Sequence, residues 1–155
     1  MPTLLHNAID IACTPEALFD YVTQPWRWHE WHPSSLSAQA SVETLKIGDN
    51  FDERIAVQPL SPLPPTLERA THYQVLRSER GKVWEVRGTM KDAWLVIHYD
   101  FSAITDGTRF SRTLTYEARG LSRLLMPLLK PRMAAKSLIA LGNLKRRMEA
   151  AVTAR

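Results

Sequence analysis

The stretch IDIACTPEALFDYVTQPWRWHEWHP, from Ile9 to Pro33, contains the signals that decide the fold. It opens inside a run from Thr3 to Cys13 in which apolar and polar residues alternate, and this alternation predicts a strand. Thr14 suits a helix N-cap and Pro15 suits the first helical position. A short helix is therefore expected after Thr14, and Pro25 should end it near residue 23.

The rest of the stretch predicts a second short helix from Trp26 to His32, which Pro33 should stop. Strand-like runs follow it, separated by turn signals such as ERGK, MKDA and TDGT. Long runs joined by tight turns indicate an antiparallel meander. The six expected strands lie near Leu36–Glu43, Asp49–Val57, Thr66–Arg80, Lys82–Met90, Ala93–Ile104 and Thr108–Ala118.

One connection differs from these tight turns. The segment QPLSPLPP, from Gln58 to Pro65, has four prolines in eight residues and cannot pair inside a sheet. We expect a stiff, exposed loop with apolar tips at Leu60 and Leu63. This loop connects two strands and could gate the mouth of a pocket.

The pattern changes to a long helix after Gly120, with apolar residues at steps of three and four. Pro127 and Pro131 should kink or interrupt its first third, and the part from Ala134 to Ala151 should be regular. An antiparallel sheet with a long helix last is an α+β arrangement. The chain of 155 residues fits one domain over 1–155, and a sheet that wraps the helix can leave a cavity between them.

With these elements, the sequence resembles the START-like, helix-grip superfamily, which includes Bet v 1-type proteins and the polyketide cyclase/dehydrase family. The resemblance is carried by the front stretch quoted above, by GTRFSRTLTYE from Gly107 to Glu117, and by the final helix. It covers nearly the whole chain. It implies a seven-stranded curved antiparallel sheet around the C-terminal helix, two short helices after the first strand, and a deep apolar cavity under the final helix. Members bind lipids, plant hormones or polyketides, and some catalyse ring closure or dehydration.

The tryptophans and histidines from Trp26 to His32 permit three interpretations. His29 and His32 could share a metal, but no third ligand is near in sequence, so no metal site is predicted. Only Arg27 is basic among these aromatics, which argues against a nucleic-acid stacking surface. On a helix, Trp28 and Trp31 share a face with His32, and this favours a pocket wall. The alternative is that both indoles are plain core. In the resembled family, a tryptophan in this short helix lines or closes the cavity.

Strand parity places Arg112 on the same face as Phe110, Leu114 and Tyr116. An inward arginine must be paired or must meet an anionic ligand. We therefore single out Arg112 as a ligand anchor. The alternatives are a pair with Glu85 or another strand carboxylate, or a local twist that lets the side chain reach water.

The same parity rule orients the other strands. Trp84, Val86 and Met90 should face inward, Tyr99 should offer a pocket hydroxyl, and His98 should lie outside with Asp100. His98 is a candidate general base only if that face assignment is inverted. The predicted ligand-binding residues are Trp28, Trp31, Tyr73, Trp84, Tyr99, Arg112, Tyr116, Met126 and Met133.

The net charge of +4 is unevenly placed. The segment from Leu121 to Arg155 has eight Lys or Arg and one Glu, which is +7, so the first 120 residues carry −3. A solvated helix face explains this, as would an anionic ligand, an anionic membrane surface or nucleic acid. The single cysteine, Cys13, is expected to be small and buried. It allows no internal disulfide, and the start MPTLLHNAID lacks a signal-peptide pattern, so a cytoplasmic protein is expected.

The sequence has no nucleophile elbow, P-loop or dinucleotide fingerprint, and no cofactor is predicted. Our first interpretation is binding or carriage of a small hydrophobic molecule, lipid or polyketide-like, possessing a polar or acidic end. The alternative is a cyclase or dehydratase that uses the same cavity. A third interpretation is lipid carriage with weak contact to an anionic membrane through the basic helix. Nucleic acid and stable membrane insertion are not expected as partners, and the oligomeric state stays open.

Overall fold

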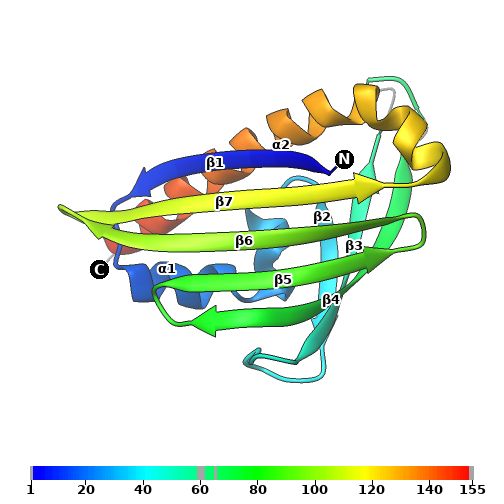
Figure 1. The fold of residues 1–155 in the computed structure, drawn as a ribbon. Helices are drawn as coiled ribbons and strands as arrows, with labels where there is room; N and C mark the ends of the chain where they lie inside the picture. The colour runs from blue at the N-terminus through cyan, green and yellow to red at the C-terminus, as the bar shows by residue number, and fades with distance from the viewer. Residues whose placement is uncertain (1, 59–61, 65, 154–155) are drawn as a thin grey trace.

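The computed structural model describes residues 2–58, 62–64 and 66–153 and has the predicted order of elements (Figure 1). Two short helices follow the first strand, and the long helix comes last. The elements are β1 (Thr3–Ile11), α1 (Pro15–Val22), the 3₁₀ helix η1 (Pro25–Glu30), β2 (Ser35–Ala40), β3 (Asn50–Val57), β4 (Leu67–Glu79), β5 (Val83–Met90), β6 (Ala93–Ile104), β7 (Gly107–Ala118) and α2 (Gly120–Thr153).

The seven strands form one antiparallel sheet in the order β1-β7-β6-β5-β4-β3-β2. Strands β2 to β7 follow the meander, and β1 closes the far edge beside β7. Figure 1 shows α2 running along one face of the curved sheet, with α1 and η1 on that same side. The predicted α+β helix-grip fold is confirmed.

The front stretch folds mainly as its capping residues predict. The hydroxyl oxygen of Thr14 accepts a hydrogen bond from the backbone N–H of Ala17 at 3.2 Å, so α1 has its expected N-cap. The second helix differs from the prediction, because it begins at Pro25, ends at Glu30 and is a 3₁₀ helix. Three residues per turn place side chains three apart directly above one another.

The long helix tolerates its two prolines. The predicted interruption is wrong, because α2 stays helical through Pro127 and Pro131. The predicted kink is present, since its first turns, in yellow in Figure 1, point in a different direction from the rest. Both prolines are exposed, so carbonyls that lose their N–H partner can be hydrated instead.

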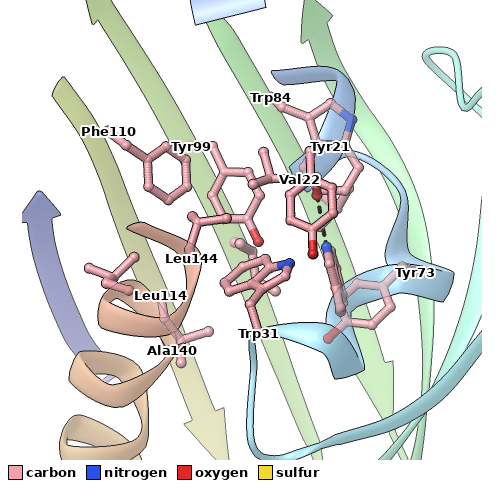
Figure 2. Close-up of a cluster of buried hydrophobic side chains, with 14 of the residues drawn as sticks. Tyr21, Val22, Trp31, Tyr73, Trp84, Tyr99, Phe110, Leu114, Ala140 and Leu144 are labelled. Atoms are coloured by element: carbon pink, nitrogen blue, oxygen red, sulfur yellow. Dashed lines mark hydrogen bonds between the residues drawn. The ribbon is translucent and has the colours of Figure 1, made fainter. Parts of the chain in front are cut away.

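The inner face of the sheet holds the core. The pairing of β5 with β6 and of β6 with β7 contains no bulge, so the predicted parity survives across these strands. Register places Tyr99 opposite both Trp84 and Arg112. Figure 2 shows Trp31 amid this cluster, with Ala140 and Leu144 of α2 to one side and sheet aromatics behind. Cys13 is buried as predicted.

A glycine on the inner face makes room for one of these aromatic rings. Gly88 pairs with Tyr73, and a Cβ at Gly88 would lie 2.7 Å from Tyr73 Cε1 and 2.8 Å from Thr71 Cγ2. We expect Gly88→Ala to lower the free energy of unfolding by about 1–3 kcal/mol, because an overpacked core must shift. Urea denaturation measures this. Gly142→Ala is the control, since its Cβ would meet only Arg146 Nη1 at 3.7 Å. Equal stability of Gly88→Ala and the unmodified protein would contradict the prediction.

Candidate functional site

A cavity of about 420 Å³ lies where β3 to β7 face the middle of α2 and the chain after η1. Its volume suits a small organic ligand, and most of its wall is apolar. The apolar wall consists mainly of Trp28, Trp31, Ile55, Val57, Met90, Leu95, Ile97, Leu114, Leu129, Met133 and Ile139.

Most of the predicted site residues meet at this cavity. Its lining includes Trp28, Trp31, Tyr73, Tyr99, Arg112, Tyr116 and Met133. Two predicted residues are placed differently. Trp84 is 0% exposed and packs in the core at 5.4 Å from the Tyr99 ring, outside the lining. Met126 is partly buried against the core and also lies outside the lining.

Arg112 is the buried cation of the cavity. Only 6% of the residue is exposed, and its Nη1 donates to Ser137 Oγ on α2 at 3.1 Å. Among the described residues, its Nε has no hydrogen-bond partner. The predicted alternative of a pair with Glu85 is wrong, since Glu85 lies on the outer face and its carboxylate is 2.7 Å from His98 Nδ1. Arg112 therefore keeps donor capacity for a ligand.

A buried carboxyl faces the same cavity, and the sequence analysis missed it. Glu53 of β3 is 6% exposed. Its two oxygens accept hydrogen bonds from Ser35 Oγ at 2.7 Å and from the Tyr73 hydroxyl at 3.1 Å. Burial raises the pKa of Glu53 to about 7, although both hydrogen bonds and the charge of Arg112 act to lower it. Applying the parity rule to β3 would have found Glu53, because it shares an inward face with Phe51.

Two buried tyrosines, Tyr73 and Tyr99, also belong to the polar part of the wall. Burial raises the pKa of Tyr73 well above its ordinary value, and the charge of neighbouring Glu53 and the hydrogen bond to it raise this pKa further. Burial raises the pKa of Tyr99 to about 12, while the Arg112 guanidinium beside it acts in the opposite direction. Both hydroxyls therefore stay protonated near neutral pH. The Tyr73 hydroxyl already donates to Glu53, whereas the Tyr99 hydroxyl can donate to an oxygen atom of a ligand.

His32 also lines the cavity, whereas His29 is exposed. Burial lowers the pKa of His32 to about 3, and the charges of Arg112 and Lys136 lower it further. The imidazole is therefore neutral. Its Nδ1 accepts from the backbone N–H of Ser34 at 3.2 Å, which assigns the ring proton to Nε2. Over the described ranges, no three His, Cys, Asp or Glu residues are arranged to hold a metal ion.

His98 stands apart from this site. It lies on the outer face of the sheet, with Nδ1 2.7 Å from Glu85 and Nε2 3.1 Å from Asp100. His98 was a candidate general base only if its strand turned the opposite face toward the cavity, with His98 inside and Tyr99 outside. The uninterrupted register of β6 with β5 and β7 keeps His98 outside, so it does not reach the cavity.

Four of the basic residues of α2 form two groups. Near the end of the helix, Lys145 pairs with Glu149 at 2.7 Å and Arg147 lies 3.6 Å from Glu30. In the middle of the helix, Arg132 and Lys136 line the cavity. Part of the uneven charge is therefore directed toward the site. Contact with an anionic surface stays a prediction, and no helix of the part described here is long and apolar enough to cross a membrane.

Comparison with known proteins assigns the family. A family profile described as "Polyketide cyclase / dehydrase and lipid transport" matches residues 3–149, so the chain belongs to that family. The search of curated proteins found no match.

Solved structures share the fold at low sequence identity. The Zhui aromatase/cyclase from a Streptomyces species has a TM-score of 0.74 at 10% identity, covering 98% of this chain and 96% of that one. A protein from Thermus thermophilus has a TM-score of 0.72 at 16% identity, covering 96% and 99%. One from Chromobacterium violaceum has a TM-score of 0.70 at 13% identity, with the same coverage. At these identities the likeness concerns the fold.

Proposed function

We propose that the protein binds a small hydrophobic molecule with a polar or acidic end in the cavity between the sheet and α2. One observation carries the proposal: Arg112 is buried at an otherwise largely apolar cavity of about 420 Å³, and its Nε has no hydrogen-bond partner among the described residues. Burying a cation is costly unless a partner compensates it, so a bound oxygen-bearing group would satisfy this donor. Membership of the family supports a more general form of this proposal, in which the cavity holds either a hydrophobic ligand or the substrate of a cyclisation reaction.

The lining suggests how the ligand lies. Its apolar body would contact Trp28, Trp31 and Leu114 of β7, which all line the cavity. Its oxygen-bearing end would lie beside Arg112 and the Tyr99 hydroxyl. The Trp31 Nε1 is also buried without a partner among the described residues, so this indole can donate to a second polar atom of the ligand.

A second candidate function is a cyclase or dehydratase reaction in the same cavity. Glu53 favours it, because a buried carboxyl with a pKa of about 7 can exchange a proton near neutral pH. Arg112 and Tyr99 would stabilise negative charge on a carbonyl oxygen. The fold likeness to an aromatase/cyclase agrees with this candidate.

Native mass spectrometry of the purified protein, followed by denaturation, tests the binding proposal. We expect a copurified small molecule that is lost in Arg112→Met and retained in Arg109→Met. Arg109 is a matched control, because it lies on the same strand but is exposed and paired with Asp10 at 2.9 Å. The proposal would be contradicted if the purified protein contained no small molecule and its tryptophan fluorescence did not change on addition of any of a panel of fatty acids and aromatic compounds. Turnover of a bound compound that stops in Glu53→Gln would favour the enzyme.

A further inference from the structure

The cavity contains one buried carboxyl and one buried guanidinium that do not form an ion pair. Glu53 and Arg112 both line it, and each is 6% exposed. Within the described ranges, no salt bridge joins them, and each has hydroxyl partners instead: Ser35 and Tyr73 for the carboxyl, Ser137 for the guanidinium. An arginine keeps its charge in proteins, so the net charge of this pair depends on the proton of Glu53.

We infer that Glu53 selects ligands by charge: a hydrophobic anion binds at Arg112 together with a proton on Glu53, whereas a neutral molecule of the same shape binds without that proton. This inference rests on the proposed function and makes Glu53 a specificity-determining residue. With Glu53 protonated, the buried pair carries one positive charge. With Glu53 ionised, its charge cancels that of Arg112 and repels an incoming anion through a medium of low polarity.

The surroundings of Glu53 make it the group that titrates. Burial already favours its neutral form and brings its pKa to about 7, and a second buried anion would raise it further. The other groups keep one charge state across neutral pH: Tyr73 and Tyr99 stay protonated and His32 stays neutral. The titratable and charged groups that face the cavity are His32 before β2, Arg69 and Tyr73 of β4, Tyr99 of β6, Arg112 and Tyr116 of β7, and Arg132 and Lys136 of α2.

Of these cations, Arg69 already has a carboxylate partner. It pairs with Asp92 and donates to Ser122 Oγ at 3.0 Å. Lys136 is exposed at the rim, where water and salt screen its charge. Arg132 is half-buried and donates to the Leu128 carbonyl of its own helix at 2.8 Å. Arg112 is therefore the most deeply buried cation of the four, and Glu53 is the buried carboxyl that can compensate it.

Two dyes with the same ring system separate the two binding modes. 8-Anilinonaphthalene-1-sulfonate is an anion at every pH used, and N-phenyl-1-naphthylamine is its neutral counterpart. We expect the affinity for the sulfonate to fall by up to about tenfold for each pH unit above 7, and the affinity for the amine to stay constant from pH 6 to 9. Dye emission measures both. Calorimetry of sulfonate binding at pH 8 in phosphate and in Tris should show uptake of close to one proton per ligand.

Variants assign the effect to Glu53. Glu53→Gln should abolish both the pH dependence and the proton uptake, and at pH 8.5 it should bind the sulfonate up to about thirtyfold more tightly than the unmodified protein. Asp52→Asn is the matched control, because Asp52 is the next residue of β3 but faces outward, 2.8 Å from His72. Arg112→Met should weaken sulfonate binding by tenfold or more, because it removes the cation that the sulfonate meets.

The outcomes separate this inference from the proposed function. If the amine binds and the affinity for the sulfonate is independent of pH, the inference is overturned and the proposed function stands. Proton uptake that persists in Glu53→Gln would also overturn it, since another group would then titrate. If neither dye binds the unmodified protein, the result counts against the proposed function as well.

Discussion

Glu53→Gln is expected to make the protein more stable above pH 7, by on the order of 3 kcal/mol, and to leave its stability near pH 4 unchanged. The fold raises the pKa of Glu53 from 4.5 to about 7 by burial. Between these values the unfolded chain has lost the proton that the folded protein keeps. The stability of the unmodified protein therefore falls as the pH rises through this window, and glutamine removes that loss because it resembles the neutral carboxyl.

Urea denaturation at several pH values, followed by tryptophan fluorescence, measures this difference. The comparison of variant with unmodified protein cancels the titration of distant groups. Asp52→Asn again serves as the control, since it removes a carboxylate from the exposed face of the same strand. It should change the stability by less than about 1 kcal/mol. Parallel pH profiles for Glu53→Gln and the unmodified protein would mean that Glu53 has an ordinary pKa in the fold.

Trp84→Ala is expected to lower the free energy of unfolding by about 3–5 kcal/mol, because it removes a large side chain from a packed interior. Trp84 is 0% exposed, and its ring lies 5.4 Å from that of Tyr99 and 6.1 Å from that of Trp28. Its indole N–H has no partner among the described residues, so the substitution breaks no side-chain hydrogen bond there. Thermal and urea denaturation measure the loss.

Trp94→Ala is the matched control for this substitution. Trp94 lies on the outer face of the same sheet, where it stacks with Arg87 at 4.9 Å and donates to Glu117 at 2.8 Å. Its removal should cost about 1 kcal/mol, since these contacts lie at a partly hydrated surface. Similar losses for the two tryptophans would contradict the assignment of Trp84 to the core.

The sequence by itself determined the order of elements and the orientation of the strand residues. Thr14, Pro15 and Pro25 act on their immediate neighbours, so their effect on α1 and η1 could be predicted locally. Arg112 could be placed on the inner face because side chains alternate along a strand without exception until a bulge occurs. Strand β7 has no register shift against either neighbour, and the prediction therefore held.

Only the tertiary structure decided which inward residues meet the cavity and what charge they hold. Alternation places Trp84 and Tyr99 on one face, but whether a residue lies under α2 or behind other rings depends on how the sheet curves. The pKa of Glu53 depends on burial by elements distant in sequence, with Ser35 and Tyr73 lying 18 and 20 positions away. Local sequence patterns specify the face of a strand to which each side chain points. Desolvation and charge coupling, in contrast, act through space between strands that only folding brings together.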